Sequence, residues 1–216
     1  MSAGRLLGLG FDLRRALLLV RLAALARLKG ATLDVRIERG VRIEGRVLVR
    51  VHPRTATTVR IGSGTRIGDG VRIVLDGGSL DIGRRVLLRN GVVLHVRGAL
   101  TFDDQSLVSY YSVIHCDELV HIGHRVGLGE HTTITDSTHV APPAGDWWYH
   151  HIETAPVRIG AGVWGGAKVT ITKGVVIGAS SVIAAGSVVT ADVEPGVVAG
   201  GIPARVIGPS PLPAPG

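Results

Sequence analysis

The feature that most constrains the fold is a six-residue period in the apolar residues that follow Gly30. Branched apolar side chains recur at every sixth position, and a glycine often comes directly after them, as in Ile61-Gly62 and Ile67-Gly68. A fixed period of this kind predicts a chain built from stacked repeats. Four series carry the period: Ile37, Ile43, Val49, Ile61, Ile67, Ile73; Ile82, Leu88, Leu94, Leu100; Ile122, Leu128, Ile134; and Ile159, Ile171, Ile177, Ile183, Val189.

A six-residue period fits short extended segments that each point one side chain inward and then turn a tight corner. Three such segments make a triangular coil, and successive coils pair in parallel. The composition agrees, because the 216 residues include 31 Gly but only 3 Trp, 3 Tyr and 2 Phe. We therefore expect an all-β parallel β-helix, with a core of stacked Val, Ile and Leu residues instead of aromatic rings.

Residues 1–30 differ from the rest and form a separate N-terminal segment. Residues 11–29 are rich in Leu, Ala and Arg, contain no Gly or Pro, and predict a helix that ends at Gly30. Its apolar stripe is expected at Leu13, Leu17, Val20, Ala24 and Leu28. Two interpretations stay open: the stripe packs on the fold or on a neighbouring subunit, or the basic helix lies on an anionic membrane surface.

The positive charge is concentrated at the same end. The chain has 24 Lys and Arg against 17 Asp and Glu, and residues 1–60 hold 13 of the basic and 4 of the acidic residues. Nucleic-acid binding by base stacking is not expected, since no aromatic residue lies between Phe11 and Phe102. The single Cys116 fits a reducing compartment, and no apolar run is long enough to span a membrane, so we expect a cytoplasmic protein.

The period breaks at two places. Residues 101–115 shift register and predict an irregular coil, whereas residues 140–157 contain no hexad and predict a loop that protrudes from the β-helix. A long loop in a regular fold usually carries function. We assign residues 31–208 to the β-helix and residues 209–216 to a Pro-rich tail.

Three segments resemble the hexapeptide-repeat acyltransferases, in particular the O-acetyltransferases of the galactoside, maltose and nodulation-factor type and their polysaccharide-modifying relatives. They are residues 122–139, residues 156–178, and the pair 183–192 with 201–207. The resemblance implies a left-handed parallel β-helix that assembles as a homotrimer with sites between subunits. It also implies acetyl-CoA or another acyl-CoA as co-substrate, no metal, and a sugar or glycan hydroxyl as acceptor.

The resemblance assigns the general base to His139, which ends a hexad series and begins the protruding loop. Imidazole suits this task because its ordinary pKa is near 6.5. His150 and His151 are the competing candidates in the same loop.

The resemblance also implies the two binding sites. The cofactor residues it assigns are Trp164, placed at a coil corner, with Gly166, Ala167, Ala185, Thr190 and Arg205. Arg205 is assigned to the CoA phosphates. Gly165 takes an apolar hexad position and is expected to leave space in the core or beside the pantetheine. The acceptor residues are Ser109, Asp117, Trp147 and Trp148; the two tryptophans offer flat faces to a sugar ring or anchor the loop on a neighbouring subunit.

Two other functions stay open. A zinc enzyme of the γ-carbonic anhydrase type would use histidines such as His115, His121, His124 and His131, although their spacing does not reproduce that family's ligands. A non-catalytic scaffold would use its basic end to dock on a membrane or partner and would not need His139.

Overall fold

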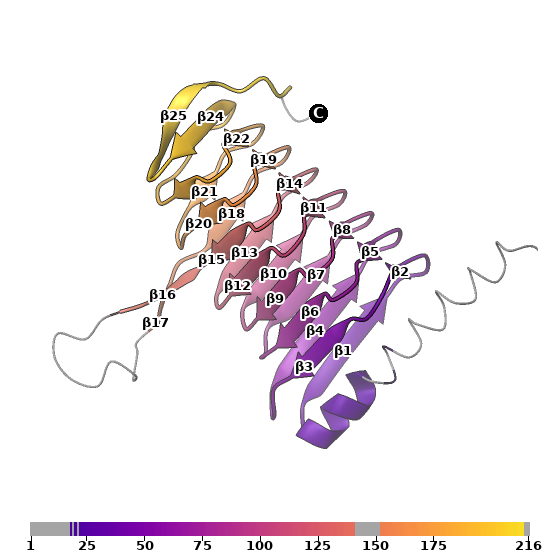
Figure 1. The fold of residues 1–216 in the computed structure, drawn as a ribbon. Helices are drawn as coiled ribbons and strands as arrows, with labels where there is room; N and C mark the ends of the chain where they lie inside the picture. Colours follow the sequence, from indigo (N-terminus) through magenta and orange to yellow (C-terminus); the bar gives the residue numbers. More distant parts are fainter. Residues whose placement is uncertain (1–17, 19, 21, 141–151, 214–216) are drawn as a thin grey trace, which may run out of the picture.

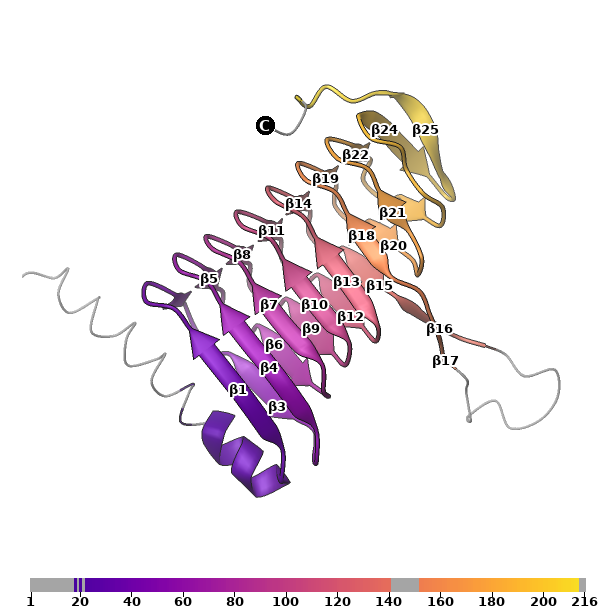
Figure 2. The ribbon, with the colours of Figure 1, turned by 180° about the vertical axis from the view of Figure 1, so that it is seen from behind.

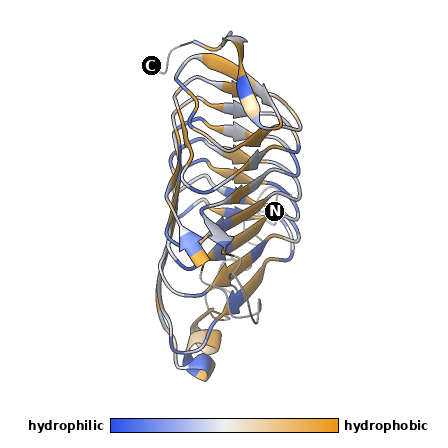
Figure 3. Ribbon diagram, turned by 90° about the vertical axis from the view of Figure 1, so that its left-hand side faces the viewer, coloured by the Kyte–Doolittle hydropathy of each residue, from blue (hydrophilic) through white to orange (hydrophobic). Residues whose placement is uncertain are grey.

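The computed structural model describes residues 18, 20, 22–140 and 152–213. The chain winds into seven triangular coils, and the strands of each coil stack on those of the next to form three parallel sheets (Figures 1 and 2). Figure 3 shows the hydrophobic strand segments, in orange, recurring from coil to coil. The predicted parallel β-helix is confirmed.

Each coil contributes one strand to each sheet. Sheet A contains β1 (Thr32–Ile37), β4 (Ala56–Ile61), β7 (Ser79–Ile82), β10 (Ala99–Phe102), β13 (Leu119–Ile122), β18 (Val157–Ile159) and β21 (Val176–Ile177). Sheet B contains β2 (Arg42–Ile43), β5 (Arg66–Ile67), β8 (Leu87–Leu88), β11 (Leu107–Val108), β14 (Gly127–Leu128), β19 (Trp164–Gly165), β22 (Val182–Ile183), β24 (Val197–Gly201) and β25 (Ala204–Pro209). Sheet C contains β3 (Leu48–Val51), β6 (Arg72–Leu75), β9 (Val93–Val96), β12 (Val113–Cys116), β15 (Thr133–Thr135), β20 (Thr170–Ile171) and β23 (Val188–Val189).

Residues 101–115 form a regular coil, so the prediction of an irregular one is wrong. Phe102, Val108 and Ile114 are buried at the usual six-residue spacing and continue the columns of the coils on either side. The apparent shift arises because strands of sheet A in these coils carry two inward residues, such as Leu100 and Phe102. The coils are therefore longer than three hexads, and the hexad count restarts at each coil.

Gly165 leaves no empty space in the core, so the first of the two predicted alternatives is wrong, and space beside the pantetheine stays a prediction. It lies between Leu128 and Ile183 in the inward column of sheet B. A Cβ atom at Gly165 would lie 3.2 Å from Cδ2 of Leu128, so the leucine side chain already occupies that space. The missing side chain is thus compensated from the preceding coil.

The N-terminal helix closes the first coil, but with a different face from the predicted one. Residues 22–29 are helical. Leu18 and Leu22 are buried in the core and Ala26 is also buried, whereas Val20 is 66% exposed and Leu28 is 82% exposed. The predicted stripe is therefore wrong for the described residues, although the helix does pack on the β-helix.

The C-terminal end is closed by an antiparallel hairpin, in which β24 pairs with β22 on one side and with β25 on the other. β25 includes Pro209, one residue beyond the expected end of the β-helix. The segment that follows folds back on the last coils, since the Ser210 N–H donates to the Gly196 carbonyl at 2.8 Å. Because it crosses the last coil, no further parallel strand is added.

Close stacking at the corners predicts which glycines cannot be replaced. A Cβ atom at Gly98 would lie 2.2 Å from the carbonyl oxygen of Glu118 in the next coil. We expect Gly98→Ala to lower the free energy of unfolding by about 1–3 kcal/mol, as overpacking typically does. Gly208→Ala is the matched control, because no atom lies within 4 Å of the added Cβ. Equal urea unfolding midpoints for the two variants would contradict this account.

Candidate active site

In the part of the chain that the structure describes, the chain leaves the β-helix between the fifth and sixth coils. β16 (Ser137–His139) and β17 (Ile152–Thr154) form an antiparallel pair that projects from the end of β15 (Figure 1). His139 is exposed and lies opposite Ile152 in this pair. The predicted base therefore lies on an arm outside the core. Trp147, Trp148, His150 and His151 lie outside the described residues.

Asp136 anchors this arm to the β-helix. It occupies the inward column in which the preceding coils place Leu75, Val96 and Cys116, and it is fully buried. Its Oδ1 accepts the N–H of Asp117 at 2.8 Å, and its Oδ2 accepts the N–H groups of Glu118 and Leu119 at 2.8 and 2.7 Å. Its carbonyl accepts the Ala155 N–H at 2.9 Å. One buried residue thus joins both ends of the inserted segment to the corner that carries Asp117.

Asp117 is held by the next coil and by the preceding one. Ser137 Oγ donates to its Oδ2 at 2.5 Å, and Arg97 Nη1 lies 3.3 Å from its Oδ1. Arg97 in turn pairs with Asp76 at 3.0 Å, and Asp76 with His52 at 3.4 Å. The carboxylates of Asp76 and Asp117 therefore alternate with His52, Arg97 and Ser137 along one edge of sheet C, and this row ends at the base of the arm. We call these five residues the polar ladder: His52, Asp76, Arg97, Asp117 and Ser137.

The two predicted acceptor residues within the described chain do not meet. Ser109 precedes β12 and Asp117 follows it, so they lie at opposite edges of sheet C on the fourth coil. His95 and His115 point outward from the same sheet, with 3.4 Å between their Nδ1 atoms. Burial, and then the charge of His115, lowers the pKa of His95. The face between Ser109 and Asp117 therefore presents histidine rings.

Five of the six predicted cofactor residues lie on the sixth and seventh coils. Gly166 and Ala167 follow β19, and Ala185 follows β22, so all three lie at the corner between sheets B and C. A Cβ atom at Gly166 would lie 2.6 Å from the Ala185 nitrogen, so close stacking by itself requires glycine there. Thr190 follows β23 at the far edge of sheet C.

Trp164 and Arg205 lie apart from that corner. Trp164 is in β19 on the outer face of sheet B, not at a corner as predicted, and it is 50% exposed. Its ring covers Gly127, where a Cβ atom would lie 2.6 Å from Cε3. Arg205 is exposed on β25, and its Nη1 donates to the Ala204 carbonyl at 2.8 Å.

Sequence reasoning missed Arg97 and Asp136. The signal was available, because Asp76, Arg97, Asp117 and Ser137 follow one another at intervals of 20 or 21 residues, the length of the coils in that part of the chain. Cys116, by contrast, is no candidate nucleophile. Burial, and then the charge of Asp136, raises the pKa of its thiol to about 12.

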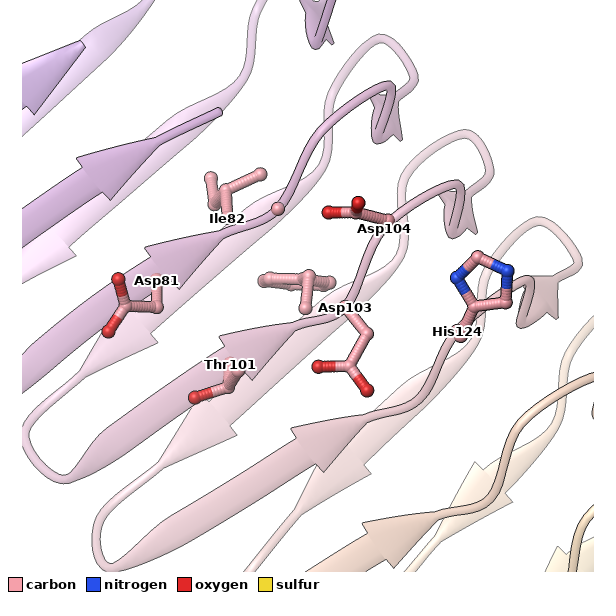
Figure 4. A pocket seen from close by; sticks show the side chains of 8 residues that line it. Asp81, Ile82, Thr101, Asp103, Asp104 and His124 are labelled. Carbon is pink, nitrogen blue, oxygen red and sulfur yellow. The ribbon is translucent and has the colours of Figure 1, made fainter. Parts of the chain in front are cut away.

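A separate hollow of about 440 Å³ lies on sheet A, as Figure 4 shows. Asp81, Asp103, Asp104 and His124 line it. All three carboxylates are engaged, since Asp104 accepts the Arg84 N–H at 2.7 Å, Asp103 lies 3.1 Å from His121 Nε2, and Asp81 lies 3.6 Å from Arg60. Within the described residues, no group of three His, Cys, Asp or Glu side chains could hold a metal ion.

The structural neighbours share this fold. The polysialic acid O-acetyltransferase OatWY matches with a TM-score of 0.58 at 20% identity, over 86% of this chain and 92% of that one. A mutant of AntD, an N-acyltransferase from Bacillus cereus, matches with a TM-score of 0.54 at 18% identity, over 83% and 82%. The left-handed parallel β-helix predicted from the resemblance is confirmed.

The curated relatives are acetyltransferases by name, although no model of a known protein family matches the chain. The galactoside O-acetyltransferase of Escherichia coli (strain K12) is 58% identical over 52 residues, which are 24% of this chain and only 26% of the relative. The putative lipopolysaccharide biosynthesis O-acetyl transferase WbbJ of the same organism is 30% identical over 144 residues, 62% of this chain and 74% of the relative. This chain therefore belongs to the hexapeptide-repeat acetyltransferase family.

Proposed function

We propose that the protein transfers an acetyl group from acetyl-CoA to a hydroxyl group of a sugar or glycan, with His139 as general base. The observation that carries the proposal is the order of the candidate residues along sheet C. Ser109 and Asp117 lie on either side of β12 in the fourth coil, and His139 leaves from the fifth. Gly166, Ala167, Ala185 and Thr190 lie at the edges of sheet C on the sixth and seventh coils. An acceptor and a thioester laid along this face would meet at the arm that carries His139.

The chemistry follows from this order. His139 takes the proton of the acceptor hydroxyl as its oxygen attacks the thioester carbonyl, because a neutral hydroxyl is a weak nucleophile. The carbonyl oxygen becomes an oxyanion, which N–H donors can stabilise. The C–S bond then breaks, the CoA sulfur leaves and takes up the proton, and the new ester remains on the acceptor. Direct transfer fits the site, since the protonated and buried thiol of Cys116 offers no covalent route.

The donor end is suited to an extended thioester. Gly166, Ala167 and Ala185 carry little or no side chain, so a pantetheine arm can lie against backbone groups at this corner. The exposed guanidinium of Arg205 would pair with CoA phosphates, which are its natural partners. Thr190 is exposed at the other edge of sheet C and would contact the pantetheine through its hydroxyl.

The acceptor end is suited to sugar hydroxyls through Asp117. Its side chain is only 12% exposed, and Ser137 and Arg97 fix both carboxylate oxygens. We expect Asp117→Asn to raise KM for the acceptor roughly tenfold or more, the size of one charge-assisted hydrogen bond, and to leave KM for acetyl-CoA unchanged. Steady-state kinetics with each substrate varied in turn measure this split. An equal rise in both KM values would contradict the assignment.

The activity itself is tested by release of free thiol from acetyl-CoA in the presence of mono- and oligosaccharides, with longer acyl-CoA donors alongside. We expect thiol release that depends on the acceptor. Stoichiometric zinc in the purified protein, together with hydration of carbon dioxide, would instead favour the γ-carbonic anhydrase alternative. A protein without acyl-CoA turnover would favour the scaffold alternative.

We also propose that the active form is a homotrimer with sites between subunits. Support comes from β24–β25, where Ile202 is 75%, Val206 58% and Ile207 67% exposed. Large apolar side chains gathered in this way are typical of protein contacts. The arm that carries His139 also projects away from its own β-helix (Figure 2), so in a trimer it would be free to contact a neighbouring subunit.

A further inference from the structure

An apolar groove lies between the N-terminal helix and the first coil. It encloses about 370 Å³, with Leu18, Ala24, Leu25 and Leu28 on the helix side and Arg46, Val47, Leu48 and Val49 on the other. Seven of these eight residues are apolar. Leu28, on the outer edge, is 82% exposed, and Val20 on the same helix is 66% exposed. The face of the helix that does not pack on the core is therefore also apolar, and the fold leaves it open.

The same end of the molecule is rimmed by cations. Lys29 and Arg54 are brought together where the Arg54 N–H donates to the Lys29 carbonyl at 3.2 Å. Arg46 lines the groove, and Arg50 follows it on β3. In the described part of the chain no acidic side chain pairs with Arg27, Lys29, Arg46, Arg50 or Arg54, although all five are exposed.

The nearby acidic side chains already have partners: Asp69 accepts the backbone N–H of Arg46 at 2.6 Å, and arginines outside the rim engage the others. Asp34 pairs with Arg36, Glu38 with Arg84, and Glu44 with Arg66. These five exposed cations are thus left on the surface at the end of the molecule that carries the groove.

An apolar groove with a cationic rim fits an amphiphile that has acyl chains and a negative headgroup. A second copy of this chain fits less well, because it would bring the same unpaired cations against the rim. We propose that this end of the β-helix docks on an anionic lipid surface, with Val20 and Leu28 at the acyl boundary and the rim cations on the headgroups. Docking does not depend on the proposed function.

Docking in this way leaves the candidate active site in water. The helix lies at the extreme end of the stack, beside β1 and β3 (Figures 1 and 2). His139 leaves from the fifth coil, and four coil steps at the spacing of paired strands amount to about 19 Å. No described helix is long and apolar enough to cross a bilayer, so the contact is with the surface.

The test is sedimentation of the full chain with vesicles of phosphatidylcholine alone and with one third phosphatidylglycerol, at low and high salt. We expect binding only to the anionic vesicles, and weaker binding at high salt. Arg46→Gln and Arg50→Gln should each weaken binding roughly fivefold, the contribution of one cation near the surface. Leu28→Ser should weaken it at low and high salt alike, since it removes apolar contact.

Arg158→Gln is the matched control, because Arg158 is an exposed cation on β18, far along the stack, and should leave binding unchanged. Equal binding to both vesicle types, or none to anionic ones, would overturn the proposal. Binding of Arg46→Gln to anionic vesicles as tightly as the wild type would also overturn the proposal. If Leu28→Ser lowered the oligomeric state of the protein in solution and left vesicle binding unchanged, the groove would be a contact with a second copy of this chain. Thiol release with a soluble acceptor should be the same in all four variants.

Discussion

Replacing His139 by Ala should lower kcat for acetyl transfer roughly 10²- to 10⁴-fold, the usual contribution of a general base. The fold should be unaffected, because His139 is exposed on an arm outside the core. Thiol release from acetyl-CoA measures the first effect, and thermal unfolding monitored by circular dichroism measures the second. A large loss of turnover with an unchanged Tm separates a chemical role from a structural one.

His124→Ala is the matched control for this experiment. His124 lines the hollow on sheet A, on a different face from the arm. We expect its turnover to match that of the wild type. Unchanged turnover in His139→Ala, or an equal loss of turnover in His124→Ala, would contradict the role of His139 as general base.

Replacing Asp136 by Ala should have the largest effect on stability. It would leave three backbone N–H groups of residues 117–119 without their acceptor, and each such loss typically costs 1–3 kcal/mol, so we expect a decrease of about 3 kcal/mol or more in the free energy of unfolding. Urea denaturation measures it. The variant should also raise KM for the acceptor in the fraction that remains folded, because Asp117 loses its backbone anchor.

Asp81→Ala tests whether this effect is specific. Asp81 is also a carboxylate on a strand, but it faces the surface and lies 3.6 Å from Arg60. An exposed pair of this kind contributes about 0–1 kcal/mol. Similar unfolding free energies for the two variants would contradict the role assigned to Asp136.

The six-residue period was enough to predict the β-helix, because an inward apolar residue at every sixth position is needed to keep the core continuous. It was not enough to predict where coils end. Phe102 was placed in an irregular coil because strands with two inward residues, such as Leu100 and Phe102, lengthen the coil and restart the count. The length of each corner depends on contacts with neighbouring coils, which a local period does not contain.

The N-terminal helix shows a different limit of prediction from the sequence. Leu18 and Leu22 form one apolar stripe, and Val20 and Leu28 belong to another. Periodicity predicted the helix but could not choose between two apolar faces. Packing against the first coil makes that choice, and the face left over is the one that we assign to lipid.

The candidate site was predicted in part. The resemblance placed His139 at the start of the protruding segment, which the structure describes as the arm of β16 and β17. Arg97 and Asp136 were missed because their roles depend on hydrogen bonds to residues in a neighbouring coil. Asp136 lies in an otherwise apolar column. In the sequence it appears only as a polar residue that interrupts the apolar pattern.

The most direct test of the central claim is the nature of the acetyl bond formed on a saccharide acceptor. Purified wild-type protein, acetyl-CoA and the acceptor should give a product that carries one acetyl group, and mild alkali should remove that group, as it removes an ester. His139→Ala should give little or none of this product. An alkali-stable acetyl group would indicate transfer to an amine, and an equal yield from His139→Ala would contradict the proposed base.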